Sequence, residues 1–296
     1  MKVAITGANG LIGKKLIVEL NKLSVEYIAL TRRCVCDLGL NFVQTDYSVA
    51  SLSGIFKEID IVIHLAANRG SGAFVYEEYQ KNENLTEDVL KAMVCANCKR
   101  IIYISSISVY SDTDLLPWKE DQHVIPVSFY GLSKLACEYL CQLYVSKGIE
   151  FTILRCAHVL GIEKRGYMLS RFMEAAYAHK SLCVKGKSIA HREFIYVKDV
   201  ANAICWAVNN TSTCNQVFNL GYGIGYTNYE IAVLINTAFR NSEQINYEDE
   251  LSEGIVDSYM DVNKLKSAGF VPTYSIETAM DDLFLSLIHI SEPTRH

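Results

Sequence analysis

The sequence has 296 residues, of which 50% are hydrophobic and 21% charged, and its formal net charge is −5. This length and composition allow a large core in one domain or two lobes. The acidic balance, without a lysine- and arginine-rich run, argues against nucleic acid as a partner. No stretch approaches the ~20 apolar residues of a membrane span. We expect no membrane association and, because the chain starts with a strand rather than a signal peptide, a cytoplasmic protein.

The first predicted strand, Lys2–Thr6, leads through a glycine-rich turn into a predicted helix, Ile12–Leu23. Glycines in this context permit a tight turn, and the helix N-terminus faces a bound pyrophosphate. The turn therefore predicts a dinucleotide site. Its expected cofactor-binding residues are Gly7, Asn9, Gly10, Leu11, Ile12 and Gly13.

The second predicted strand, Tyr27–Thr31, ends in Arg32 and Arg33, where NAD-binding proteins place an acid for the ribose hydroxyls. A guanidinium suits a 2′-phosphate, so this strand end favours NADP over NAD as the cofactor. Two other interpretations stay open. Asp37 lies four residues further on and a shifted loop could bring it in, or the two arginines are simply solvated.

Short apolar runs alternate with amphipathic segments through the first 160 residues. This alternation predicts right-handed βαβ units and an α/β fold with a Rossmann-type, doubly wound parallel sheet. We assign residues 1–165 to an NAD(P)-binding domain. Its further expected strands are Ile61–Leu65, Arg100–Ser105 and Phe151–Arg155, and its further helices are Tyr79–Ala96 and Tyr130–Lys147.

One helical turn separates Tyr130 from Lys134, so both side chains share a helix face. A phenol must lower its pKa by about 3 units to serve as a base at pH 7, and a nearby ammonium acts in that direction. Ser106 could hydrogen-bond the same reacting oxygen. Together these three side chains fit proton removal from an alcohol whose carbon loses hydride, although the spacing of Tyr130 and Lys134 alone could arise by chance.

After Gly161 the pattern becomes mixed. Met168–His179 and Val197–Val208 are expected helices, and Gln216–Gly221 and Val256–Val262 are expected strands. We assign residues 166–285 to a smaller, mainly substrate-binding lobe whose return segments interleave with the main sheet. Residues 286–296 are set apart as an artefactual or disordered tail.

The ten cysteines lie singly in apolar segments, apart from a lone CxxC at Cys95 and Cys98 and the pair Cys34 and Cys36. Without a second pair of ligands, such spacing does not predict a metal site. We expect reduced, mostly buried thiols and no bound metal.

Six motifs in order resemble the extended short-chain dehydrogenase/reductase family, in its NAD-dependent epimerase/dehydratase branch, which includes UDP-glucose 4-epimerase. The resemblance runs from Met1 to about Asp282. Thr6–Gly13 fits TGxxGxxG, and His64–Ala67 fits HxAA. The matching segments further on are Tyr103–Tyr110, Pro126–Lys134 (PxSxYGxSK), Leu154–Gly161 and Arg192–Asp199.

The resemblance implies a role for each matching residue. Tyr130 is the catalytic acid/base, Lys134 tunes it and contacts the nicotinamide ribose, and Ser106 orients the substrate oxygen. Asn82 is the fourth catalytic candidate, with a structural role as the alternative. Further cofactor-binding residues are Asp46, Tyr47, Leu65, Ala66, Ala67, Ser105 and Cys156, and the substrate-binding residues are Ser106, His158 and Arg192.

Departures from the family pattern narrow the range of reactions and substrates expected of this chain. Ser106-Ile107-Ser108 stands where 4,6-dehydratases carry Thr-Asp-Glu. The chain therefore lacks the acid that would protonate a leaving hydroxyl, and dehydration is not expected. His158 replaces a usual Asn and Cys156 a usual Pro. Ser252-Glu253-Gly254 replaces an Arg-Pro-Gly whose arginine grips the nucleotide diphosphate, and Arg192 partly restores that contact.

The sequence thus favours an NAD(P)-dependent epimerase or reductase acting at the 4-position of a nucleotide-sugar. A reductase of a small non-nucleotide carbonyl compound and a catalytically silent cofactor-sensing protein are the alternatives. The resemblance also implies a homodimer formed through exposed helices, including Tyr130–Lys147.

Overall fold

The computed structural model describes residues 1–32, 41–70, 75–162, 168–248 and 256–291, with side chains to residue 288. Arg33 and Asp37, and the segment Ser252–Gly254, lie outside the described residues.

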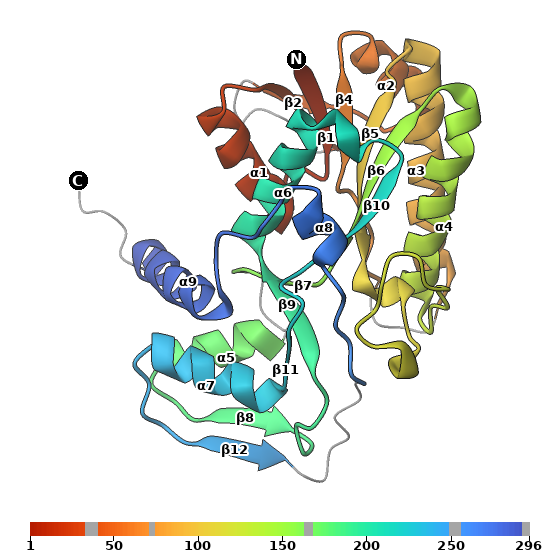
Figure 1. Cartoon of the computed structure of the whole chain (residues 1–296). Helices are drawn as coiled ribbons and strands as arrows, with labels where there is room; N and C mark the ends of the chain where they lie inside the picture. Colours follow the sequence, from red (N-terminus) through yellow and green to blue (C-terminus); the bar gives the residue numbers. More distant parts are fainter. Residues whose placement is uncertain (33–40, 71–74, 163–167, 249–255, 292–296) are drawn as a thin grey trace, which may run out of the picture.

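A parallel sheet forms the centre of the larger part of the molecule (Figure 1). Its strand order, β10-β6-β5-β4-β1-β2-β3, reverses direction of winding between β1 and β4. All neighbouring pairs are parallel. The strands are β1 (Lys2–Thr6), β2 (Glu26–Thr31), β3 (Phe42–Gln44), β4 (Ile61–His64), β5 (Arg100–Ser106), β6 (Glu150–Cys156) and β10 (Gln216–Leu220).

Helices cover both faces of this sheet (Figure 1). One face carries α1 (Leu11–Lys22) and α6 (Val197–Asn209), and the other carries α2 (Val49–Phe56), α3 (Glu77–Ala96) and α4 (Phe129–Leu143). Every residue of β4 and β5 is buried, which explains why their apolar residues are consecutive rather than alternating with polar ones. The doubly wound α/β fold expected from the sequence is confirmed.

A smaller lobe packs at the carboxyl end of the sheet. It contains a three-stranded sheet of β11 (Gly225–Tyr226), β9 (Arg192–Tyr196) and β7 (His158–Leu160), and a pair of β12 (Ile245–Glu248) and β8 (Leu182–Lys185). Its helices are α5 (Met168–Tyr177), α7 (Asn228–Ala238) and α9 (Ile276–Ser291). Phe172, Phe194, Ile231 and Met280 belong to its separate core.

The chain passes repeatedly between the two parts. After β9 it returns to the main sheet as α6 and β10, enters the lobe again through β11, α7 and β12, and comes back as α8 (Asn263–Ser267) before α9. Residues Ser286–Ser291 continue α9, and residues 292–296 lie outside the description. Short 3-10 helices occur at Ile107–Val109, Thr113–Leu115, Tyr144–Lys147 and Thr211–Thr213.

One expected element is wrong. Val256–Val262 forms no strand, because only two isolated bridges, at Ser258 and Met260, link this segment to its neighbours. Its backbone forms single hydrogen bonds with the backbone of His191, Glu193 and Trp118, and the Glu193 carboxylate accepts a further 2.7 Å hydrogen bond from the Met260 amide. None of the helices in the described part of the chain combines the length and apolar character needed to cross a bilayer.

Candidate active site

The glycine-rich turn after β1 packs directly against the turn after β4. Gly7 has a φ of +69°, and a Cβ there would stand 2.7 Å from the Ala66 nitrogen. The hydroxyl of Thr6 accepts hydrogen bonds of 3.1 Å from the amides of Leu65 and Ala66. This close approach leaves the N-terminus of α1 open toward a cavity, as a pyrophosphate site requires.

Two adjoining cavities of about 610 and 450 Å³ extend along this edge of the sheet and share five lining residues. Together they are lined by most of the expected cofactor residues. These are Gly7, Asn9, Gly10, Leu11, Ile12, Gly13, Arg32, Tyr47, Leu65, Ala66, Ala67, Ser105, Tyr130 and Lys134. The glycine cradle and this lining fit a dinucleotide.

Arg32, Tyr47 and Asp46 are the residues expected to contact the adenosine half of the cofactor, near the end of β2. Arg32 lines the cavity and its guanidinium lies 5.2 Å from the centre of the Tyr47 ring. The Tyr47 hydroxyl donates a 3.0 Å hydrogen bond to the Leu30 carbonyl. Asp46 is not among the lining residues of the described cavities, and its carboxylate accepts a 2.8 Å hydrogen bond from the Ser48 amide at the start of α2. The structure therefore does not place Asp46 with the cofactor residues.

The first turn of α4 is fixed against the turn that follows β5. The Ser128 hydroxyl caps the helix by accepting a 3.0 Å hydrogen bond from the Gly131 amide. A Cβ on Gly131 would stand only 2.0 Å from the Ser108 carbonyl oxygen, so glycine is needed for this contact. The contact brings Tyr130 toward Ser106, and both residues line the same cavity.

Burial raises the pKa of Tyr130 above its usual value. The charge of Arg69 and the hydrogen bond with Ser106 act in the opposite direction. Arg69, a residue that the sequence reasoning did not identify, thus acts in the direction expected from Lys134 but does not outweigh burial, and the tuning role of Lys134 stays a prediction.

Lys134 is buried behind Tyr130. Its ammonium donates a 2.6 Å hydrogen bond to the Ile104 carbonyl and lies 4.5 Å from the centre of the Tyr103 ring. Burial lowers the pKa of Lys134 to about 8. The side chain lines the cofactor cavity, as expected for a ribose contact.

Asn82 holds the turn after β4 to α4. Its amide nitrogen donates to the Asn68 carbonyl (3.0 Å) and the Ser133 hydroxyl (3.2 Å), and its amide oxygen accepts from the Asn68 nitrogen (2.6 Å). These contacts correspond to the structural alternative considered for this residue, which also lines the cofactor cavity, and its catalytic role stays a prediction.

A third cavity, of about 410 Å³, adjoins the cofactor cavity at Tyr130 and opens toward the smaller lobe. It is lined by Ser106, Cys156, His158 and Arg192, so the expected substrate residues lie together, and Cys156 faces this cavity rather than the two cofactor cavities. Sequence reasoning missed further lining residues. They include Arg69, Ser108, Met168, Leu169 and Phe194.

The polar groups of this third cavity differ in charge. Arg192 donates a 2.6 Å hydrogen bond to Asn228, which ties β9 to α7 within the smaller lobe. Burial, together with Arg192 and Arg69, lowers the pKa of His158 to about 4, so His158 is neutral at pH 7. The described residues contain no group of three His, Cys, Asp or Glu side chains able to hold a metal ion.

A tyrosine and a serine at the junction of a dinucleotide cavity and a second cavity match the arrangement expected from the motifs. Residues 3–221 match the family described as the NAD dependent epimerase/dehydratase family. The chain belongs to this family. The resemblance inferred from the sequence is thereby confirmed.

The similarity to known proteins covers most or nearly all of the chain. UDP-N-acetylglucosamine 4-epimerase from Bacillus cereus is 35% identical with a TM-score of 0.89, covering 97% of this chain and 99% of that one. The structure of MoeE5 in complex with UDP-glucose and NAD is 26% identical with a TM-score of 0.86, covering 99% and 100%. UDP-glucose 4-epimerase of Halalkalibacterium halodurans is 27% identical over 78% of both chains.

Proposed function

We propose that this protein is an NAD(P)-dependent epimerase that inverts the 4-hydroxyl of a UDP-sugar. The observation that carries the proposal is the position of Tyr130, whose side chain lines both the 450 Å³ cofactor cavity and the 410 Å³ substrate cavity. A proton acceptor at that junction reaches a hydroxyl bound in one cavity while its carbon faces a cofactor in the other. The similar proteins act on or bind UDP-sugars, which supports this substrate class.

The site residues divide the chemistry between them. Tyr130 takes the proton of the 4-hydroxyl and later returns it, and Ser106, which lines the same cavity, hydrogen-bonds the substrate oxygen and holds it in line with the phenol. The bound nicotinamide supplies the hydride acceptor and donor. Lys134 holds the nicotinamide ribose, and Arg192, at the far side of the substrate cavity, holds the diphosphate.

Inversion requires that the 4-keto sugar turn within its cavity before hydride returns. Neutral His158 and the apolar side chains of Met168 and Phe194 line the cavity and offer no charged contact to the sugar ring. A reductase would instead use hydride once and release oxidised cofactor. The choice between NADP and NAD rests on Arg32 and stays a prediction.

Turnover of UDP-glucose and UDP-N-acetylglucosamine with bound cofactor tests the proposal. Tyr130→Phe should lower kcat by about 10²–10⁴-fold, because it removes the acid/base but keeps the ring. Tyr139→Phe, on the exposed side of the same helix, is the matched control and should keep full activity. Stoichiometric loss of reduced nicotinamide absorbance would show a reductase, unchanged kcat in Tyr130→Phe would exclude Tyr130 as the acid/base, and no turnover by the wild type would leave only a cofactor-binding role.

We also propose that two copies pair through α4. This helix exposes Leu132, Tyr139 and Leu143, the last with 68% of its surface accessible, on the side away from the sheet. A cluster of large apolar side chains is typical of a covered face. Leu143→Glu should shift sedimentation from dimer to monomer, and a monomeric wild type would reject the pairing.

For the cellular location we propose the cytoplasm. Each of the eight cysteines in the described residues is a free thiol, which is usual in a reducing compartment. Fractionation of cells that produce the protein tests this, and recovery outside the cytoplasm would contradict it.

A further inference from the structure

A buried ion pair lies behind the active site, between α4 and β6. Glu138 has 0% of its surface accessible and Arg155 has 5%. Arg155 Nη2 lies 2.8 Å from Glu138 Oε2, and Arg155 Nε donates to both carboxylate oxygens at 3.1 and 3.2 Å. Removing two charges from water opposes folding, and apolar side chains of similar size often serve stability as well. The pair therefore calls for a role beyond stability.

The pair is connected directly to the residues of the active site. Glu138 stands one helical turn beyond Lys134 and two turns beyond Tyr130 on α4. Its carboxylate also accepts a short hydrogen bond from the hydroxyl of Ser105, the neighbour of Ser106 at the end of β5. Arg155 directly precedes Cys156, which lines the substrate cavity. One ion pair thus ties the catalytic helix to the ends of two strands.

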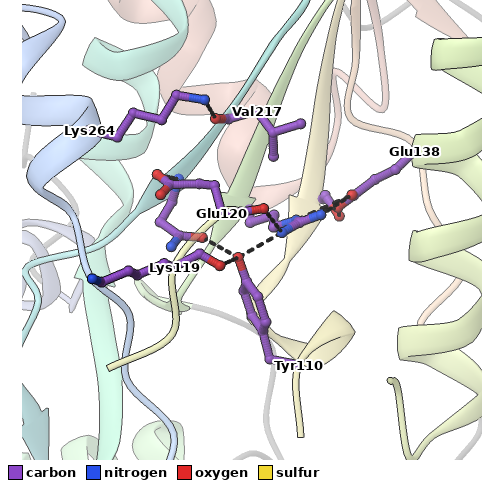
Figure 2. Close-up of polar contacts among 9 residues, drawn as sticks. Tyr110, Lys119, Glu120, Glu138, Val217 and Lys264 are labelled. Carbon is purple, nitrogen blue, oxygen red and sulfur yellow. Dashed lines mark hydrogen bonds and ion pairs between the residues drawn. The ribbon is translucent and has the colours of Figure 1, made fainter. Parts of the chain in front are cut away.

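The guanidinium of Arg155 extends the connection to the segment after β5, and Figure 2 shows Tyr110, Glu120 and Glu138 of this network. The guanidinium donates a 2.7 Å hydrogen bond to the Tyr110 hydroxyl and a 3.2 Å bond to the Glu120 carbonyl. The Tyr110 hydroxyl donates in turn to Asn219 Oδ1 at 2.9 Å. Tyr110 ends the 3-10 turn that begins at Ser106, so Arg155 holds the end of this turn and Glu138 holds Ser105, the residue before its start.

We propose that Glu138 and Arg155 are positioning residues that set the distance between the Tyr130 hydroxyl and the Ser106 hydroxyl. Tyr130 comes from α4 and Ser106 from β5, and the ion pair is the polar link that reaches both elements and β6 together. Neither residue lines the substrate cavity, so both act through their neighbours. The inference rests on the role of Tyr130 in the proposed function but not on which sugar is bound.

The test replaces both charges at once, with Glu138→Met and Arg155→Met in one chain, so that no buried charge is left unpaired. Kinetics should show kcat about 10²-fold lower with KM for the UDP-sugar unchanged, since small displacements at a reacting centre have effects of that size. The tyrosinate absorbance, measured as the difference from the matching Tyr130→Phe chain, should titrate at higher pH, because the hydrogen bond with Ser106 lowers the pKa of Tyr130. Unchanged kcat and titration would overturn the proposal.

Arg100→Met is the matched control. Arg100 is also buried, with 7% accessible, and lies at the opposite end of β5, where it donates to the carbonyls of Ala207 and Asn210. The Arg100→Met variant should have a lower melting temperature, but the pH at which the Tyr130 phenol titrates should not change. An equal shift in this variant would reduce the ion pair to a general structural role and so overturn the proposal.

Arg155→Lys covers the case in which the double variant does not fold. It keeps the positive charge but loses the two-pronged contact with Glu138, so kcat should fall about 10-fold and the titration should move the same way. Wild-type behaviour of this variant would also overturn the proposal. If no UDP-sugar is turned over even by the wild type, the proposed function fails, while the titration still tests the ion pair.

Discussion

His64, at the end of β4, should make the stability of the protein depend on pH. The imidazole is buried between two hydroxyls, with Nδ1 2.7 Å from Thr6 Oγ1 and Nε2 3.1 Å from Thr86 Oγ1. Burial, aided by the charge of Lys134, lowers the pKa of His64 from 6.5 to about 3. Below pH 6.5 the unfolded chain therefore binds a proton that the folded chain does not, so stability is fully present above this pH and is lost as pH falls.

The magnitude follows from the two pKa values. The difference is 6.5 − 3 = 3.5 units, which amounts to about 4.8 kcal/mol once the pH is well below 3. Between pH 8 and pH 5 the loss attributable to His64 is about 2 kcal/mol of unfolding free energy. His158, with its pKa lowered to about 4, acts in the same direction, so the total slope is steeper than that from His64 alone.

Reversible urea unfolding at several pH values between 5 and 8 measures the effect. His64→Asn should be less stable than wild type at pH 8, because it loses the contact with Thr86, but its stability should fall by about 2 kcal/mol less on going to pH 5. His179→Asn removes an imidazole from the surface and should run parallel to wild type. If His64→Asn also runs parallel to wild type, the imidazole is not buried in its neutral form and the reasoning is refuted.

Three other substitutions test single features of the site. Arg32→Ala should weaken NADP binding by calorimetry about 10-fold or more and NAD binding little, since only NADP carries a 2′-phosphate; equal losses would remove the preference for NADP. Gly13→Ala places a methyl group 2.6 Å from the Ala8 oxygen, so unfolding free energy should fall by about 1–3 kcal/mol and cofactor affinity with it; a stable variant with normal affinity contradicts this packing. Asn82→Ala should lower the melting temperature but reduce kcat far less than Tyr130→Phe, and an equal loss of kcat would instead make Asn82 a catalytic residue.

The parts of the fold that the sequence predicted are those with strong local signals. The apolar runs of β1 and β5 and the long amphipathic α3 match their expected ranges closely because burial on both faces, or on one helix face, fixes the pattern. The smaller lobe was predicted less completely. Strands such as β8, with alternate buried and exposed residues over four positions, are too short to stand out, and Val256–Val262 has the residues of a strand but lacks a ladder partner.

The candidate site was predictable where a motif fixes the backbone, as around Gly7 and Tyr130. Arg69 could not be found in this way, since it follows the HxAA motif at a position defined only by how the turn folds back toward Tyr130. Asp46 is a different case, because the family resemblance implies a cofactor contact for it, while its carboxylate accepts a hydrogen bond from Ser48 at the start of α2 and its role stays a prediction. The buried pair of Glu138 and Arg155 joins residues 17 positions apart, and only the packing of α4 on the sheet reveals it.

The repeated crossing of the chain between the two parts limits how the protein can be dissected. A fragment ending at residue 165 would lack β10 and α6, although all six other strands of the sheet would be present. Strand β6 would then become an unpaired edge, and the apolar surface of α1 and the sheet that α6 covers would be exposed to water. Such an edge invites pairing between chains and aggregation, so the nucleotide-binding half is best studied by substitutions within the intact chain.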